Sequence, residues 1–266
     1  MSWRVRYPLQ TRSQVWFYCF CRLATYLAYR LFFRFRRYGM ENLPVSGPCI
    51  LVSNHQSHLD PPAIGHCGRR RGIHFIARGS LFNNKGFAWL IRALNSIPIR
   101  RGEADLKAIK EALRRLDAGA AVVVFAEGTR SETGAMKVFE RGTLLLLRKS
   151  RCPVVPVAVE GFYDIWPKGS SGPKLFGGRA AIRLGTPIPH DELMGDGPDE
   201  ALRRLAREID ALRLQLRATL REASKGRFPA EGAGDKTVDP SDWYADGDTK
   251  KTAEASSAPA GSSNQD

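Results

Sequence analysis

The first 40 residues contain no aspartate or glutamate, although eight arginines lie among them, so this segment carries a charge of +8 without acidic partners of its own. The chain also lacks the run of about 20 uncharged apolar residues that a membrane-spanning helix needs. Its most apolar segment, residues 15–35, is interrupted by Arg22 and Arg30, and an arginine at the centre of a bilayer costs about 2.5 to 3.5 kcal/mol. A spanning anchor is therefore the less favoured interpretation of this segment.

Cysteines are few, and their spacing forms no known cluster. There are five of them with no C-x-x-C pair, which argues against a disulfide framework and a standard zinc cluster. Reduced thiols and a cytosolic compartment are expected. The motifs H-E-x-x-H and G-x-S-x-G are also absent. Because no A-x-A-like cleavage site follows the basic amino terminus, we expect that segment to be retained.

The charge balance is the next constraint. Across 266 residues, 41 lysines and arginines face 27 aspartates and glutamates, which gives a net charge of +14. A hydrophobic content of 43% with 26% charged residues is close to that of average globular domains, so wholesale disorder is excluded. The positive charge predicts an anionic partner, which could be a phospholipid surface, a phosphorylated substrate or nucleic acid. Nucleic acid is disfavoured because the common recognition motifs are absent and the apolar amino-terminal segment would have no role.

Residues 15–35 are aromatic and apolar at a spacing compatible with a helix. A helix lying in the membrane interface would direct its apolar side chains toward the acyl chains and its arginines toward the headgroup phosphates. The predicted lipid-facing residues are Trp16, Phe17, Phe20, Leu27, Leu31 and Phe35. A helix that merely covers the core of the domain is the alternative. The aromatic density and the missing acids favour the membrane interpretation, with the protein peripheral or monotopic on the cytoplasmic face of the cell membrane.

From residue 39 onward, short apolar runs alternate with helical stretches, which is typical of an α/β domain with a mostly parallel central sheet flanked by helices. The predicted strands are 49–53, 73–77, 96–99, 121–125, 154–159 and 180–184, and the predicted helices are 105–116, 141–149 and 199–222. In the last helix, apolar residues recur at steps of three and four, so its arginines are expected on an outer face, toward solvent or lipid. We predict three regions: a membrane-associated amphipathic helical segment over 1–38, the α/β domain over 39–228, and a disordered acidic tail over 229–266.

The motif N-H-Q-S-H-L-D, residues 54–60, follows the first predicted strand, at the sheet edge where α/β folds bind ligands. In one regular helix, His55 and Asp60 would be rotated roughly 140° apart and could not pair. If His55 lies in the loop and Asp60 in the first turn of the next helix, the carboxylate can orient the imidazole as a general base. The alternatives are a structural capping aspartate, metal ligation that includes His58, and, least favoured, a nucleophilic Ser57.

A second polar loop follows the strand at 121–125, where the sequence continues A-E-G-T-R-S. Backbone amides around Gly128, the Thr129 hydroxyl and the Arg130 guanidinium would make an anion cradle, although a plain turn with a surface ion pair fits this loop alone equally well. Arg78 and Arg101 also follow predicted strands. A solvated basic rim is the alternative use of these arginines.

Four blocks in order and register resemble the glycerolipid acyltransferases related to 1-acylglycerol-3-phosphate acyltransferase. They are N-H-x4-D at 54–60, the strand ending in Arg101, F-x-E-G-T-R-S at 125–131 and V-P-V at 155–157, all within residues 40–190. Ala126 departs from the proline that is usual in the third block. The resemblance implies an acyltransferase domain over 39–228. His55 is then the general base and Asp60 its partner, and the acceptor-phosphate site comprises Arg78, Arg101, Glu127, Gly128, Thr129 and Arg130.

The reaction that this resemblance implies is transfer of a fatty acyl group from an acyl thioester, acyl-CoA or acyl carrier protein, to a lysophospholipid hydroxyl. The expected acceptor is 1-acylglycerol 3-phosphate and the product phosphatidate, with another lysophospholipid or glycerol phosphate as alternative acceptors. An imidazole with an ordinary pKa near 6.5 suits that proton transfer. No metal or redox cofactor is expected. The competing interpretations are a hydrolase that uses the same pair on water, and a non-catalytic basic protein that docks on membranes.

Overall fold

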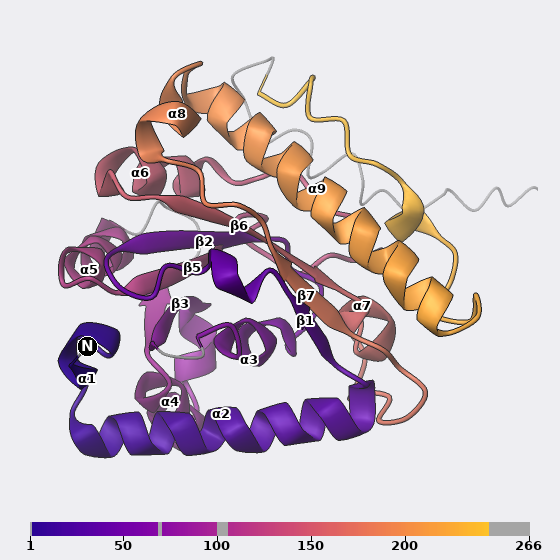
Figure 1. The fold of residues 1–266 in the computed structure, drawn as a ribbon, viewed down its shortest axis with the longest axis horizontal. Coiled ribbons are helices and arrows are strands. Elements are labelled where there is room, and N and C mark those ends of the chain that lie inside the picture. The colour runs from indigo at the N-terminus through magenta and orange to yellow at the C-terminus, as the bar shows by residue number, and fades with distance from the viewer. Residues whose placement is uncertain (1, 69–70, 100–105, 245–266) are drawn as a thin grey trace, which may run out of the picture.

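The computed structural model describes residues 2–68, 71–99 and 106–244. Within these ranges, a seven-stranded sheet lies between two helical layers (Figure 1). The strands are β1 Arg36–Tyr38, β2 Cys49–Ser53, β3 Ile73–Arg78, β4 Ser96–Ile99, β5 Ala121–Phe125, β6 Val154–Glu160 and β7 Ala181–Leu184. The helices are α1 Trp3–Arg6, α2 Arg12–Phe33, α3 Asp60–Gly65, α4 Lys85–Ala93, α5 Leu106–Asp117, α6 Arg141–Ser150, α7 Phe162–Ile165, α8 His190–Met194 and α9 Pro198–Ala223.

The strand order is β1-β7-β6-β2-β5-β3-β4, and the five strands from β6 to β4 are mutually parallel. Only β7 and its parallel neighbour β1 run the other way. The predicted α/β class with a mostly parallel sheet is therefore confirmed, and each predicted strand lies within one residue of its observed bounds. Strand β1 escaped prediction because it is three residues long and contains two arginines, so it offers no apolar run.

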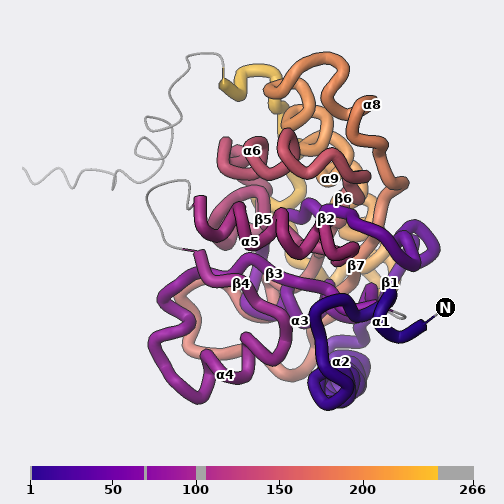
Figure 2. Tube along the Cα trace, turned by 90° about the vertical axis from the view of Figure 1, so that its left-hand side faces the viewer, coloured from indigo at the N-terminus to yellow at the C-terminus, as the bar shows by residue number. Residues whose placement is uncertain are grey.

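Alternate residues of the central strands pack against opposite layers, as the two-residue period of a strand requires. Ile50 and Val122 point into the core beneath α5, α6 and α9. Leu51 and Val123 point into a second core that Tyr29, from α2, shares with residues of α3. Figure 2 shows α2 and α9 at opposite ends of this arrangement, with the sheet between them. Because both faces are covered, the central strands are apolar throughout.

Helix α2 starts with a capping box in which Thr11 and Gln14 accept each other's backbone N–H, and it ends at Phe33 before Arg34 in the left-handed conformation. Two of its buried residues, Tyr29 and Phe33, belong to the second core. Of the predicted lipid-facing side chains, Trp16, Phe20, Leu27 and Leu31 are exposed and Phe17 is half-buried. Phe35 was wrongly predicted, because it lies beyond the helix and is fully buried in the second core. Among the described residues, no helix has the length and apolarity needed to cross a bilayer.

Both predicted region boundaries, after residues 38 and 228, fall within packed structure. Residue 38 is the last residue of β1, which pairs with β7, so the amino-terminal segment is part of the sheet. Disorder was wrongly predicted for residues 229–244, which lie along α9 (Figure 1). Trp243 is buried in the main core, and Asp235 bridges Arg217 and Arg221 of α9. The rest of the predicted tail, 245–266, falls outside the described residues.

Candidate active site

Strands β2 and β5 are adjacent and in register, with Ser53 opposite Phe125, so the loops that follow them leave the sheet side by side. Two backbone bonds join these loops. The Ala126 N–H donates to the Ser53 carbonyl at 3.1 Å, and the Ser131 N–H donates to the His55 carbonyl at 2.7 Å. The two polar motifs of the sequence therefore form one continuous surface at the carboxyl edge of the sheet.

His55 and Asp60 are in contact: the imidazole Nδ1 lies 2.8 Å from the carboxylate Oδ2. Residues 54–57 are non-helical and Asp60 is the first residue of α3, which is the loop-to-helix arrangement that lets the chain fold back. The same Oδ2 accepts the backbone N–H groups of Gln56 at 2.6 Å and Ser57 at 2.7 Å. Asp60 is fully buried, so its position is set by these donors.

The imidazole of His55 is held flat and keeps one nitrogen available. Its ring stacks on Phe125 with centroids 4.0 Å apart. With the Nδ1 proton donated to Asp60, the lone pair lies on Nε2, which no described residue engages in a hydrogen bond. The side chain is 17% exposed, enough for Nε2 to meet a substrate. This pair can accept a proton from a hydroxyl group and return it to a leaving group.

The sequence predicts Glu127 as part of the acceptor-phosphate site, and the structure buries its side chain beneath the loop. One carboxyl oxygen accepts the His55 N–H at 2.8 Å, and the other accepts the Lys137 N–H at 3.0 Å. Burial raises the pKa of Glu127 to about 8, although both hydrogen bonds act in the opposite direction. Glu127 thus holds the backbone of His55 from within the protein.

The cationic side of the site is formed by Arg78 and Arg130. Arg78 Nη2 lies 3.5 Å from Thr129 Oγ1. Burial lowers the pKa of His58, and the positive charges of Arg130 and Arg78 lower it further. The Asp60 carboxylate attracts Arg130 electrostatically, but no described carboxylate lies within ion-pair distance of that guanidinium. Gly128 has a φ of +64°, and a Cβ there would lie 2.7 Å from the Glu140 side chain, so the turn requires glycine. Arg101 falls outside the described residues.

The other interpretations of the first motif find little support in the geometry. The Ser57 hydroxyl is buried and donates to the Trp166 carbonyl at 2.9 Å. The His58 ring packs edge-on against Trp166. Over the described ranges, no three His, Cys, Asp or Glu side chains are grouped as a metal site.

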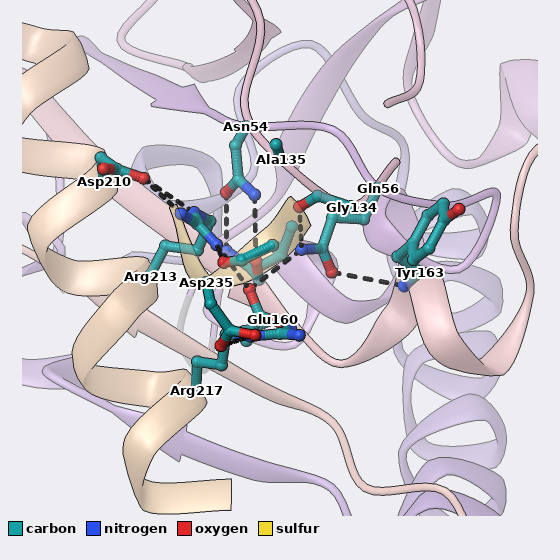
Figure 3. Close-up of polar contacts among 12 residues, drawn as sticks. Asn54, Gln56, Gly134, Ala135, Glu160, Tyr163, Asp210, Arg213, Arg217 and Asp235 are labelled. Atoms are coloured by element: carbon teal, nitrogen blue, oxygen red, sulfur yellow. Dashed lines mark hydrogen bonds and ion pairs between the residues drawn. The ribbon is translucent and has the colours of Figure 1, made fainter. Parts of the chain in front are cut away.

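Sequence reasoning missed two residues that connect the motif to the rest of the protein, Gln56 and Glu160. Both are buried, and Gln56 Nε2 donates to Glu160 Oε2 at 3.0 Å (Figure 3). Glu160 in turn meets Arg217 of α9 at 2.6 Å. The sequence did contain a signal for Glu160, which directly follows the apolar strand 154–159. An acid buried at the end of such a strand needs a counter-charge beside it.

Comparisons with known proteins point to acyltransferases. Residues 34–160 match the family model described as Acyltransferase. The chain is 34% identical over 137 residues to the chloroplastic 1-acyl-sn-glycerol-3-phosphate acyltransferase BAT2 of Brassica napus, covering 50% of this chain and 39% of that protein. It is 30% identical over 196 residues to the 1-acyl-sn-glycerol-3-phosphate acyltransferase of Pseudomonas aeruginosa, covering 72% of each chain.

The fold has a solved counterpart in the 1-acyl-sn-glycerophosphate (LPA) acyltransferase PlsC of Thermotoga maritima, with a TM-score of 0.65 and 26% identity over 84% of this chain and 86% of that one. The chain spans only 39%, 50% and 55% of the lengths of the 1-acyl-sn-glycerol-3-phosphate acyltransferases that it matches in Brassica napus, Arabidopsis thaliana and Ovis aries. The bacterial relative is matched over most of its length. The shared motifs, the shared sheet and this broad match place the chain in the glycerolipid acyltransferase family, with the 1-acyl-sn-glycerol-3-phosphate acyltransferases among its relatives.

Proposed function

We propose that this protein transfers a fatty acyl group from an acyl thioester, either acyl-CoA or acyl carrier protein, to the free hydroxyl of 1-acylglycerol 3-phosphate, giving phosphatidate. The observation that carries the proposal is the His55–Asp60 contact of 2.8 Å with Nε2 left open, beside the Arg130 loop. The names of the relatives in Brassica napus and Pseudomonas aeruginosa agree with this reaction.

In the proposed step, Nε2 of His55 removes the proton of the acceptor hydroxyl as its oxygen attacks the thioester carbonyl carbon. The new C–O bond forms, the C–S bond breaks, and the proton on His55 passes to the departing thiolate. Asp60 holds the proton on Nδ1 and stabilises the imidazolium that forms in between. The chain's own groups thus supply both proton transfers, and no acyl-enzyme is needed.

Phosphate recognition is assigned to Arg130, with Arg78 beside it. Arg130 is half-buried, its pKa is lowered by burial, and no described carboxylate pairs with it, so a phosphate would satisfy a partly desolvated charge. Thr129 and the backbone around Gly128 lie in the same loop. Arg101 is a further candidate from the sequence motif alone.

The central experiment supplies purified protein with a labelled acyl thioester and a panel of acceptors with and without a phosphate monoester. His55→Ala should lower turnover by about two to four orders of magnitude while the protein stays folded. His58→Ala is the matched control, because that imidazole lies three positions away against Trp166 and should leave turnover near wild type. Wild-type turnover in His55→Ala, or free fatty acid as the main product, would refute the proposal.

A second variant tests the phosphate site. Arg130→Ala should raise the KM for a phosphorylated acceptor much more than that for an unphosphorylated one. An equal rise for both would contradict phosphate binding. The same panel separates 1-acylglycerol 3-phosphate from glycerol phosphate and other lysophospholipids, and acyl-CoA from acyl carrier protein.

We further infer that the protein attaches peripherally to a phospholipid membrane through α2. Its exposed apolar residues recur along one face of the helix: Trp16, Phe20, Leu23, Leu27 and Leu31. Trp89 of α4 is exposed next to this face and contacts Phe17. Burial lowers the pKa of Arg179, and the nearby charges of Arg34 and Arg36 lower it further. These arginines therefore form a cationic cluster near the end of α2. Anionic headgroups would neutralise that cluster.

Flotation with vesicles of phosphatidylglycerol and phosphatidylcholine tests the attachment. The double variant Phe20→Ser with Leu31→Ser should lose most vesicle binding, since it removes two large apolar side chains from the exposed face. Val45→Ser with Leu106→Ser removes exposed apolar side chains elsewhere and serves as the control. Undiminished flotation of the α2 variant would show that α2 is not the membrane contact.

A further inference from the structure

A buried polar network connects the catalytic loop to the carboxyl-terminal helix (Figure 3). At its centre Glu160, fully buried at the end of β6, lies 2.6 Å from Arg217 and 3.6 Å from Arg213. Asp210 pairs with Arg213 at 2.6 Å and Asp235 pairs with Arg217 at 2.8 Å. These three carboxylates and two guanidinium groups form the centre of the network, and each of the two guanidinium groups contacts Glu160. At its edge, Arg221 pairs with Asp235, and Asp164 lies 4.0 Å from Arg217.

The residues after α9 complete this network. Arg213 donates to the carbonyls of Gly234 and Lys236, and Arg217 donates to that of Ala230. The second Asp210 oxygen accepts the Val238 N–H at 2.8 Å. Residues 230–238 thus supply most of the remaining hydrogen-bond partners of the Arg213 and Arg217 guanidinium groups. Without such partners, these buried charges would destabilise the protein.

Gln56 is the point at which the network reaches the catalytic pair. Its side-chain Nε2 donates to Glu160 at 3.0 Å and to the Gly134 carbonyl at 3.4 Å, and its Oε1 accepts the Tyr163 N–H at 3.3 Å. Its backbone N–H donates to Asp60 Oδ2 at 2.6 Å, the oxygen that also holds His55. One residue is therefore fixed by three side-chain contacts and delivers a backbone donor to the catalytic carboxylate.

We propose that Gln56 and Glu160 are positioning residues for the His55–Asp60 pair, and that the ion pairs of α9 and residues 230–238 hold Glu160 in place for this purpose. The inference rests on the acyl-transfer function proposed above. Loss of the side-chain contacts of Gln56 frees its backbone N–H to move, and Asp60 then orients the imidazole less well. Such a loss slows the chemical step while leaving acceptor binding in place, because Arg130 and Arg78 lie on other segments.

The test starts with Gln56→Met, which has similar size and no hydrogen-bonding group. We expect kcat to fall about 100-fold, as for an ångström-scale misplacement of a catalytic group, with little change in the KM of the phosphorylated acceptor. Tyr244→Phe is the control, since it removes another side-chain hydrogen bond, 2.7 Å to the Phe139 carbonyl, far along the chain from the loop. Wild-type kcat in Gln56→Met, or a fall confined to KM, would overturn the proposal.

A rescue experiment separates positioning from general stability. Gln56→Glu alone places two carboxylates against each other and should lose at least as much activity as Gln56→Met. Adding Glu160→Gln exchanges the amide and the carboxylate across the same contact, and should recover at least about tenfold in kcat, a coupling expected only for residues in direct contact. Recovery of thermal stability without recovery of kcat would mean that the network is only structural.

Two further measurements keep the outcome interpretable. If Gln56→Met does not fold, Gln56→Asn is assayed by the same criteria, and failure of both to fold would make the pair a folding element and overturn the proposal. Backbone hydrogen exchange over residues 54–60 should accelerate in the folded variant relative to Tyr244→Phe. That readout does not depend on turnover, so an inactive wild-type protein would count against the proposed function and not against the positioning.

Discussion

The loop of residues 54–57 is held between two buried glutamates that differ in how their charges are balanced. Glu160, on the β6 side, lies against two guanidinium groups. Glu127, on the β5 side, accepts two backbone N–H groups and forms no ion pair with any described residue. Burial raises the pKa of both, and at Glu160 the two arginines oppose that rise. Two arginines therefore balance the charge of Glu160, whereas Glu127 is largely neutral near pH 7.

This difference follows from what each glutamate touches. Glu127 contacts the backbone of His55 itself, and a neutral carboxyl there leaves Asp60 as the negative group that orients the imidazole. Glu160 contacts the loop through the side chain of Gln56, and two arginines lie against its carboxylate there. Of the two glutamates, the one on the Gln56 side is held by ion pairs, whereas the one that holds the His55 backbone does so through neutral hydrogen bonds. Four substitutions or conditions test that contrast.

The largest effect is expected from Arg217→Leu. It removes the cation 2.6 Å from Glu160 and leaves a buried carboxylate with the more distant Arg213. Breaking a buried pair on one side typically costs about 3 to 5 kcal/mol of the free energy of unfolding, measurable by urea denaturation. Arg204→Leu on the same helix is the control, since its pair with Glu192 is partly exposed and should contribute about 1 kcal/mol or less. Equal losses in the two variants would remove the contrast between buried and surface charge.

Glu127→Gln should have an intermediate effect. Both carboxyl oxygens accept a backbone N–H, so the amide nitrogen of glutamine must oppose one of these donors. An unsatisfied buried donor costs about 1 to 3 kcal/mol. The measurement is the free energy of unfolding at pH 6, where the wild-type carboxyl is mostly protonated and differs little from the amide in charge. A neutral substitution would mean that one of the two backbone contacts contributes nothing.

The sequence predicted the parts of this site whose residues lie close together in the chain or directly follow a strand. Five apolar runs located the parallel strands, and their carboxyl ends located His55, Asp60 and the Arg130 loop. Gln56 and Glu160 were missed because 104 positions separate them and the contact exists only once β2 and β6 are neighbours. The pattern of α9 suggested an outer arginine row, yet Arg213 and Arg217 are buried, since residues 230–238 cover that face.

The third test is the pH dependence of stability, which should differ between the Glu127 side and the Glu160 side of the loop. Because the folded-state pKa of Glu127 is raised from 4.5 to about 8, the folded protein holds a proton that the unfolded chain has released in that interval. Its contribution to stability is present below about pH 4.5 and is lost as the pH rises through about 8. The difference in free energy of unfolding between wild type and Glu127→Gln should therefore decline with rising pH, by at most about 1.4 kcal/mol per unit. A difference that is constant from pH 5 to 8 would contradict a raised pKa.

The smallest effect is expected from Asp235→Asn, at the outer end of the Glu160 network. Hydrogen bonding to Arg221, followed by that to Arg217, holds the pKa of Asp235 well below its usual range, so its contribution to stability is present above pH 3.8 and is lost as the pH falls below that value. Asparagine keeps an acceptor oxygen and removes only the charge. Since Asp235 is 31% exposed, we expect a loss of about 0.5 to 1 kcal/mol that shrinks in high salt. Asp239→Asn removes the same charge at a carboxylate that forms no ion pair with a described arginine and feels Arg207 only at longer range, so it should be nearly neutral. Opposite pH trends at Glu127 and Asp235 would show that the two sides hold the loop by different electrostatics, whereas a common trend would mean that the ion pairs do not set the contrast.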